Sequence, residues 1–191
     1  MSTLCLTCKC GKLKGIAQHI DNNSVTRIVC YCKDCQSFAI ELNAGYAMND
    51  HGGTAIFQVP PSKLIITEGS QYLRSLRLTP KGLIRWYAGC CNTPVGNTLS
   101  AKLPFIGVIE AFISANEDVE SKLGPVRGSV FVKSARTPPP ASLRGSDNTF
   151  SLHTRILVSL LKWKIKYSQC QSPFFLPDGN PVCQPRIVKK K

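Results

Sequence analysis

The chain has 191 residues, of which 43% are hydrophobic, and 24 basic against 11 acidic side chains give a formal net charge of +13. This length predicts one domain with an appended tail, and the composition is ordinary for a soluble globular protein. No run approaches the roughly 18 apolar residues that span a bilayer, and the first residues lack the apolar core of a secretory signal. We therefore expect a cytoplasmic protein without a membrane span.

The first predicted elements are two short strands, at residues 13–20 and 24–31. The Asp and Asn side chains between them bond to their own backbone and tolerate left-handed conformations, so residues 20–24 are expected to form a turn. The strands would then make a hairpin with cysteines near both outer ends, a common scaffold for zinc knuckles.

Further short strands are expected along the chain, separated by Gly and Pro. A second hairpin is predicted from residues 73–78 and 83–90, where Leu83, Arg85 and Tyr87 alternate with residues of the opposite face. The other expected strands cover residues 52–59, 61–69, 105–113 and 124–134. Many short strands with this punctuation predict a mainly β domain.

The composition changes after residue 135, which divides the chain into a zinc-binding β domain at 1–135 and a C-terminal part at 136–191 packed on the same domain. Three consecutive prolines predict a loop at 136–148. A helix is predicted at 150–167, and we expect its apolar face to dock on the β domain rather than on a membrane. The last segment, 173–188, is expected to be an extended tail held by its phenylalanines.

The ten cysteines fall mainly into three groups. Without a secretory signal, disulfides are a disfavoured use for them, and metal binding or thiol chemistry is favoured. Cys170 and Cys183 stand apart and are expected to be buried apolar residues. The groups are Cys5, Cys8 and Cys10; then Cys30, Cys32 and Cys35; then Cys90 and Cys91.

The first and third groups predict one tetrahedral zinc site. Zinc favours four thiolate or imidazole ligands at about 2.3 Å, contributed as close pairs from separate turns. Gly11 after Cys10 permits a positive φ and leaves backbone N–H groups free to face sulfur. Cys8 and Cys10 could therefore close a site with the Cys90–Cys91 turn.

The middle group predicts a second zinc site with Cys30, Cys32 and Cys35 as ligands. Three protein ligands leave the fourth position open for water or substrate, which marks a reactive zinc rather than a structural one. A redox dithiol at Cys32 and Cys35 is an alternative, although the βαβ setting typical of such dithiols is missing.

The three cysteine motifs, in their order along the chain, resemble those of the GFA family. These are the glutathione-dependent formaldehyde-activating enzymes, which are related to the centromere protein V domain. The motifs are Cys8–Gly11 (CKCG), Cys30–Cys35 (CYCKDC) and Cys91–Pro94 (CNTP), and the resemblance covers about residues 4–110. Residues 77–98 and 172–188 are also similar to an uncharacterised bacterial branch of that superfamily.

The resemblance implies a β-tent fold of small antiparallel sheets and two zinc ions. It assigns Cys8, Cys10 and Cys91 to a structural zinc, and Cys30, Cys32 and Cys35 to a catalytic one. The implied activity is that of a carbon–sulfur lyase acting on a small aldehyde or a glutathione adduct, like S-hydroxymethylglutathione synthase.

The third motif departs from the family pattern CxxCGTP. Ala88 stands where the first cysteine is expected, and Asn92 replaces the glycine. Asn tolerates the same left-handed backbone, so the second change is mild. The missing cysteine leaves two candidates for the fourth ligand, Cys90 and Cys5.

Glutathione is anionic, which suits a basic chain. The candidate anion contacts are Lys33, Arg74, Arg77 and Arg85, and His51 is a candidate proton shuttle or zinc neighbour. The alternative function is a non-catalytic zinc-stabilised binding module for nucleic acid or protein. We disfavour a nucleic-acid partner because the basic residues are dispersed along the chain.

Overall fold

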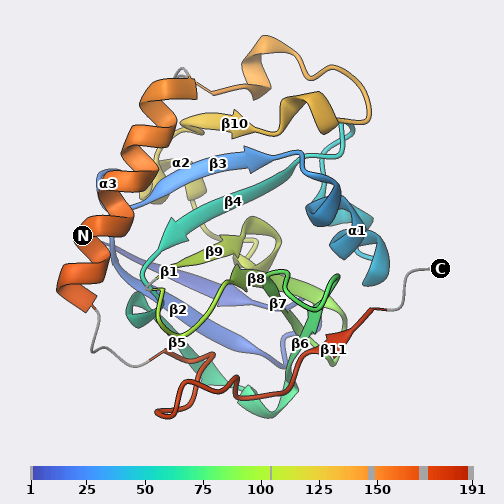
Figure 1. Ribbon diagram of the computed structural model, residues 1–191, viewed down its shortest axis with the longest axis vertical. Helices are drawn as coiled ribbons and strands as arrows, with labels where there is room; N and C mark the ends of the chain where they lie inside the picture. The colour runs from blue at the N-terminus through green and yellow to red at the C-terminus, as the bar shows by residue number, and fades with distance from the viewer. Residues whose placement is uncertain (1, 104, 146–148, 168–171, 189–191) are drawn as a thin grey trace.

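The computed structural model describes residues 2–103, 105–145, 149–167 and 172–188. The predicted mainly β architecture is confirmed: the strands form a three-stranded and an eight-stranded sheet, and a long C-terminal helix lies beside the larger one (Figure 1). In these ranges no helix has both the length and the hydropathy that crossing a bilayer requires.

The smaller sheet is antiparallel and contains β1 (Ser2–Thr7), β2 (Lys14–Ile20) and β5 (Leu64–Glu68), with β2 in the centre. Alternate residues of β1 and β2 are buried, as expected for strands with one face on the core. The turn between these two strands carries the first cysteine motif.

The larger sheet has the order β10-β3-β4-β9-β8-β7-β6-β11, and its two outermost pairs, β10–β3 and β6–β11, are parallel. The predicted hairpin of β6 and β7 is confirmed, with Leu73 opposite Ala88. The strands are β3 (Thr26–Cys30), β4 (Thr54–Val59), β6 (Leu73–Arg77), β7 (Ile84–Ala88), β8 (Thr93–Thr98), β9 (Ile106–Ile109), β10 (Gly128–Val130) and β11 (Arg186–Ile187).

The predicted hairpin of β2 and β3 is wrong, because the two strands belong to different sheets. The turn between them exists: the Asp21 carboxylate accepts N–H groups of Asn23 and Ser24 at 2.9 and 2.8 Å. It passes the chain from the smaller sheet to the larger one, so β2 pairs with β1 and β5 while β3 pairs with β4 and β10.

Within the described ranges three α-helices flank the sheets: α1 (Lys33–Glu41), α2 (Val119–Leu123) and α3 (Thr149–Tyr167). The sequence predicted α3 but neither α1 nor α2. Short 3-10 helices occupy Gly45–Ala47, Pro61–Lys63, Ser70–Tyr72, Glu110–Phe112, Val132–Ser134 and Ala141–Leu143.

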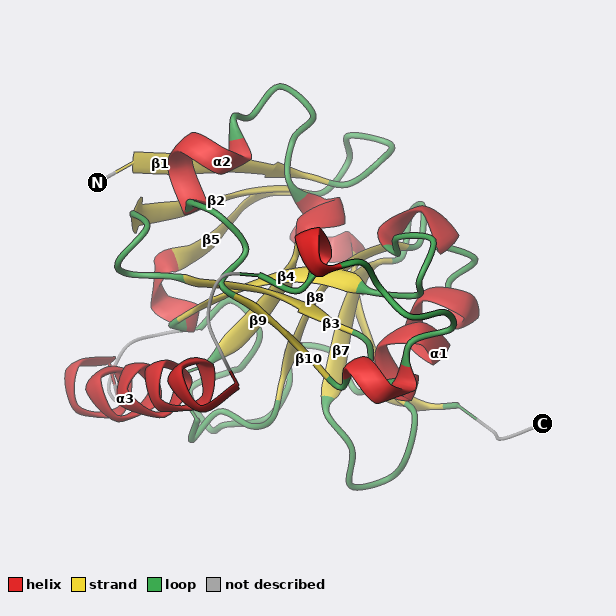
Figure 2. Cartoon of the chain, turned by 90° about the horizontal axis from the view of Figure 1, so that it is seen from above, coloured by secondary structure: helices red, strands yellow, loops and turns green. Residues whose placement is uncertain are grey.

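The long helix α3 packs on the larger sheet through one face, as Figure 2 shows from above. Leu152 is 1% exposed and Trp163 is 8% exposed, and Ile156 packs against the same apolar cluster as Leu152. The predicted docking face is therefore confirmed for these residues. The opposite face keeps apolar side chains such as Leu157 and Ile165 exposed.

The C-terminal tail returns to the core through Phe174, which is fully buried 4.9 Å from the ring of Trp86. Phe175 packs edge-on against the same indole at 6.0 Å. Cys183 is half-buried and donates to the Ser75 hydroxyl, whereas Cys170 lies outside the described residues. The tail thus covers the end of the larger sheet, and the division of the chain at residue 135 stays a prediction.

Candidate metal centres

Four cysteines from two distant turns meet in one cluster. The sulfur atoms of Cys8, Cys10, Cys90 and Cys91 all lie within 4.8 Å of one another and could hold a metal ion. The shortest separation is 3.4 Å, between Cys10 and Cys90. We call these four residues the four-cysteine cluster.

The turn from Cys8 to Leu13 has the backbone of a metal knuckle. The N–H of Cys8 donates to the Leu13 carbonyl at 2.9 Å, and the N–H of Leu13 donates to the Cys8 sulfur at 3.2 Å. Gly11 takes a left-handed conformation with φ of 75°, as its position after the second cysteine predicts. The turn thereby aims both sulfurs at one point and supplies a donor to one of them.

The Cys90–Cys91 turn brings two adjacent sulfurs to the same place. An extended chain would aim neighbouring side chains apart, but here the N–H groups of Cys91 and Asn92 both donate to the Ala88 carbonyl. Asn92 has a φ of 57°, the left-handed backbone that its substitution for glycine preserves. The structure therefore brings Cys90, and not Cys5, into the four-cysteine cluster.

Burial and hydrogen bonds set the pKa values of these thiols, and both act to raise the pKa of Cys90. Burial raises the pKa of Cys8. Burial also acts to raise the pKa of Cys91, but hydrogen bonds, led by the one with Thr93 at 3.2 Å, outweigh it and lower this pKa to about 6. A thiolate at neutral pH is the form that binds metal.

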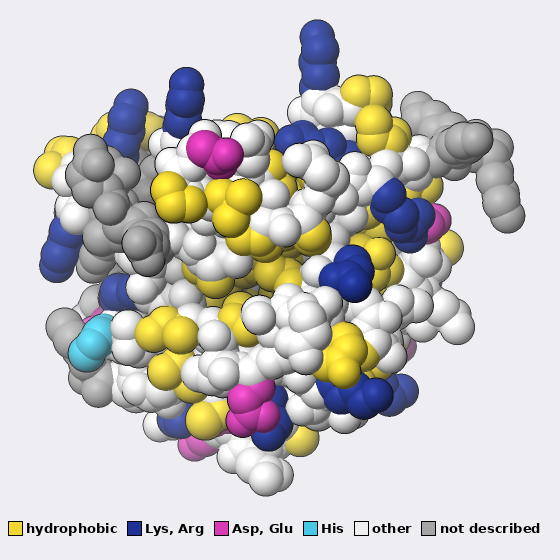
Figure 3. All heavy atoms as spheres, turned by 90° about the horizontal axis from the view of Figure 1, so that it is seen from below, with side chains coloured by type: hydrophobic (Ala, Val, Ile, Leu, Met, Phe, Trp, Pro, Cys, Tyr) yellow, Lys and Arg dark blue, Asp and Glu magenta, His cyan; other side chains and the backbone are white. Residues whose placement is uncertain are grey.

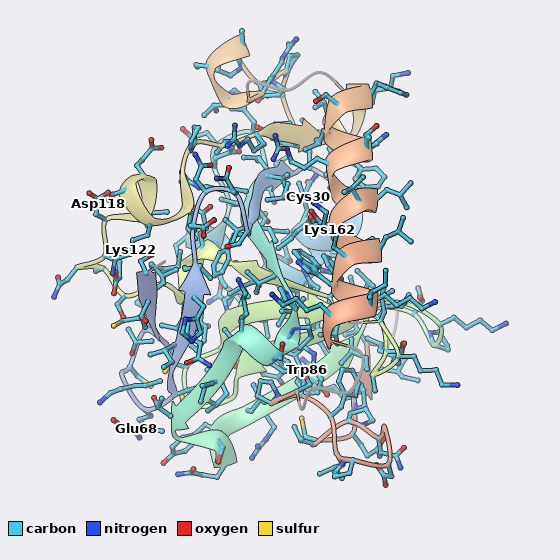
Figure 4. The ribbon with its side chains drawn as sticks, turned by 90° about the vertical axis from the view of Figure 1, so that its left-hand side faces the viewer. Cys30, Glu68, Trp86, Asp118, Lys122 and Lys162 are labelled. Atoms are coloured by element: carbon cyan, nitrogen blue, oxygen red, sulfur yellow. The ribbon has the colours of Figure 1, made fainter. Side chains whose placement is uncertain are left out.

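The second cluster lies where β3 meets α1. The sulfurs of Cys30, Cys32 and Cys35 lie within 4.8 Å of one another, and the Cys30 and Cys35 sulfurs are 3.7 Å apart. Figure 4 shows Cys30 on the side of the molecule where α3 runs, away from Asp118 and Lys122. We call these three residues the three-cysteine cluster.

Helix α1 explains why the spacing CxCxxC brings the sulfurs together. Cys32 is the N-cap of α1, and its sulfur accepts the N–H of Cys35 at 3.3 Å, so the two side chains lie on one turn. Hydrogen bonds with Cys30 and Cys35 lower the pKa of Cys32, assisted by the positive charge of Arg85. The positive end of the helix dipole favours a thiolate at the same position.

A buried arginine adjoins the three-cysteine cluster. Arg85 is 1% exposed, and its guanidinium lies 3.8 Å from the Cys35 sulfur and donates to the Asn97 side chain at 3.1 Å. It also lies 3.6 Å from the half-exposed carboxylate of Asp34 and 5.4 Å from the centre of the Phe38 ring. A buried cation requires negative partners, and here Asp34 supplies a carboxylate while the lowered pKa of Cys32 favours its thiolate.

The three-cysteine cluster opens into a cavity of about 640 Å³ between the larger sheet, the start of α1 and α3. This volume falls in the range of small-molecule sites. Polar and charged side chains in its wall come from the sheet (Gln58, Arg85 and Asn97), from α1 (Lys33 and Asp34), from α3 (His153) and from Ser134. Apolar walls are supplied by Ile28, Ile56, Leu83, Phe105, Val130 and Ile156.

Of the four predicted anion contacts, two line the cavity and two lie outside its described lining. Lys33 and Arg85 line the cavity. Arg74 and Arg77 do not belong to the described lining. Instead, Arg74 donates to the carbonyls of Gln71 and Leu73, and Arg77 donates to the Gly82 carbonyl. His51 bonds Thr137 at 2.7 Å and also lies outside that lining.

Sequence reasoning missed Asn97, Gln58, His153 and Phe131 as cavity residues. Only Phe131 has an unusual backbone, with a left-handed φ of 57° while 65% exposed at the cavity wall. Gln58 is a polar residue inside a strand whose other residues are mainly apolar, a pattern that could have indicated it, whereas the strand of Asn97 carries no such signal.

Comparisons with known proteins add a family but no activity. A family model described as a family of unknown function, DUF6151, matches residues 1–185. No curated protein matches the chain. A crystal structure of a Rhodobacter sphaeroides protein from structural genomics matches at 14% identity and a TM-score of 0.45, over 61% of this chain and 94% of that chain, a likeness too low to carry an argument.

Proposed function

Because the chain belongs to this family of unknown function, we propose its activity from its own residues: it is a zinc protein with one structural and one reactive zinc ion. The four-cysteine cluster holds the structural ion, and the three-cysteine cluster holds the reactive one. The reaction is a glutathione-dependent addition or removal at carbon–sulfur bonds of small aldehydes.

The sets of sulfur atoms fit this metal. Zinc prefers tetrahedral sites of thiolate sulfur, and sulfurs about 2.3 Å from one ion lie within 4 Å of one another. The separations of 3.4, 3.6 and 3.7 Å among Cys8, Cys10 and Cys90 are of this size. The nine described cysteines are all free thiols, so none of them is held in a disulfide.

The reactivity follows from the open coordination position. Cys30, Cys32 and Cys35 would hold a zinc ion with a fourth position open, and such an ion would lower the pKa of a thiol bound there. The glutathione thiolate attacks the aldehyde carbon, a carbon–sulfur bond forms, and the carbonyl π electrons move to oxygen. That oxygen takes one proton from solvent, so the addition needs no oxidant or reductant.

Residues in the cavity wall hold the reactants. Arg85 faces Cys35 and compensates the negative charge of three thiolates in a buried place. Asn97 fixes the guanidinium through its 3.1 Å bond. Lys33 is exposed at the mouth and is the cation available to a glutathione carboxylate.

The observation that carries this proposal is that the three-cysteine cluster opens into a cavity whereas the four-cysteine cluster supplies a complete set of four sulfurs. The first test is zinc per chain by native mass spectrometry. We expect two ions in the wild type, one in Cys32→Ser, and two in the control Cys183→Ser, which removes a thiol outside both clusters. Equal zinc content in wild type and Cys32→Ser would refute a separate second site.

The activity is tested by following glutathione and formaldehyde by proton NMR. The zinc-loaded wild type should accelerate formation of the S-hydroxymethyl adduct, and Cys32→Ser should not. Two zinc ions without acceleration would favour the second candidate, a non-catalytic binding module, whose support is the net charge of +13.

A further inference from the structure

A second cavity of about 600 Å³ lies away from the cysteines, between the end of β2, the turn before β3, the short helix at Pro61–Lys63 and α3. Neither cysteine cluster contributes to its described lining. The residues that line it are Gln18, His19, Asn23, Ser24, Ser62, Lys63, Ser159, Lys162, Trp163 and Lys166.

The described lining of this cavity is basic. Lys63 enters from one wall and Lys162 from the other, on α3 (Figure 4), with Lys166 one turn further along the helix. None of the described lining residues is acidic. Asp21 lies outside this lining; its carboxylate accepts two N–H groups of its own turn and also attracts the Lys63 ammonium.

Lys63 is partly buried. Burial lowers its pKa and the nearby Lys166 acts in the same direction, whereas the negative charge of Asp21 acts to raise it. Its ammonium donates to the His19 carbonyl at 2.5 Å, and His19 has a left-handed φ of 53° that presents this carbonyl. A positive charge kept in a concave, partly desolvated place is stabilised when an anion enters.

An unsatisfied polar group is found in the same wall. The Ser62 hydroxyl oxygen is buried and has no hydrogen-bond partner among the described residues. Buried hydroxyls nearly always have a partner, and an exception requires an explanation, of which a bound water or ion is one. Ser24, Ser159 and Asn23 add further groups able to bond to a phosphate oxygen.

We propose that this cavity binds the phosphate groups of a small molecule of the pyrophosphate or nucleotide class. Lys63 and Lys162 neutralise the charge from opposite walls, the serine hydroxyls bond the oxygens, and the indole of Trp163 forms the apolar wall for the rest of the ligand. The proposal does not rest on either zinc site.

A nucleic-acid backbone carries the same phosphate chemistry, but the geometry favours a small molecule. A backbone needs a basic stripe along the surface. Figure 3 shows Lys and Arg side chains scattered over the face seen from below rather than gathered in such a stripe. The converging lysines are found in a concave place of small-molecule size.

The test is calorimetric titration of the purified full chain with pyrophosphate, ATP and a short single-stranded oligonucleotide. We expect pyrophosphate and ATP to bind, and Lys162→Glu to weaken both by about tenfold or more. The matched control is Lys164→Glu, an exposed lysine of the same helix that does not line the cavity and should leave the affinity unchanged. Far-UV circular dichroism verifies that α3 is equally present in both variants.

A second variant removes the unsatisfied hydroxyl. Ser62→Ala should keep the stability of the protein and weaken pyrophosphate binding by a few fold. Absence of pyrophosphate and ATP binding to the wild type, or equal weakening by Lys162→Glu and Lys164→Glu, would overturn the proposal. Binding of the oligonucleotide alone would also overturn it, and would assign the lysines to a nucleic acid.

Discussion

The guanidinium of Arg85 lies 3.8 Å from the sulfur of Cys35, in a place where only 1% of the arginine is exposed. The two residues are 50 positions apart, and their contact joins β7 of the larger sheet to the first turn of α1. The positive charge of Arg85 acts to lower the pKa of Cys32 and of Cys35, and so favours the thiolate form that binds metal.

This contact predicts that Arg85→Met weakens zinc binding at the three-cysteine cluster. Outer partners of metal ligands typically contribute 10- to 100-fold to affinity, so a loss of about that size is expected. Competition with a coloured chelator measures it. The exposed Arg74→Met should leave zinc affinity unchanged, and Arg85→Lys should retain more affinity than Arg85→Met because it keeps the charge.

The four-cysteine cluster predicts different roles for two nearby cysteines. Cys10→Ser should release the structural zinc and lower the thermal midpoint, because metal-binding energy is folding energy in such sites. Cys5→Ser should change stability by less than about 0.5 kcal/mol, since Cys5 is exposed and its sulfur lies outside the cluster. Zinc content and calorimetry check both, and zinc loss from Cys5→Ser would contradict this cluster.

Two glycines test the packing around the first cysteine turn. Gly69 and Gly11 have nearly the same left-handed φ, 74° and 75°, so alanine at either costs about 1–2 kcal/mol in backbone strain. At Gly69 the added carbon would also lie 1.9 Å from the Lys12 carbonyl, whereas at Gly11 it meets nothing within 4 Å.

We therefore expect Gly69→Ala to destabilise the protein by about 3 kcal/mol or more, and Gly11→Ala by only the strain. Urea unfolding of both variants measures the difference. Equal losses in the two variants would show that the close approach of residue 69 to the cysteine turn does not exist in solution.

The carboxylate of Glu117 predicts a pH dependence of stability. It accepts the Cys5 N–H at 2.8 Å and pairs with Lys122; burial acts to raise its pKa, but these bonds lower it below the ordinary value. A lowered folded-state pKa stabilises the protein above the ordinary pKa, and this stabilisation is lost as the pH falls through the folded-state pKa.

Glu117→Gln should therefore lower the urea midpoint at pH 7, and its difference from wild type should shrink as the pH falls from about 5 to about 3. The control Glu68→Gln changes an exposed ion pair with Lys14 and should have a much smaller effect. A difference between Glu117→Gln and wild type that stays constant over this range would contradict the assignment.

The sequence by itself determined the features that depend on neighbours along the chain. The spacing of Cys30, Cys32 and Cys35 needs only one strand end and one helical turn to bring three sulfurs together. The apolar face of α3 and the β6–β7 hairpin follow from periodicity and a turn. Such local patterns are visible because their geometry repeats within a few residues.

Only the tertiary structure determined the contacts between residues that are far apart in the sequence. It places Cys90, and not Cys5, in the four-cysteine cluster, and it puts β2 and β3 in different sheets. It also brings Arg85 to Cys35, and Lys162 to the cavity that Lys63 lines. These contacts depend on the order of strands in the sheets. That order is fixed by packing of the whole core, which local hydrophobic patterns do not encode.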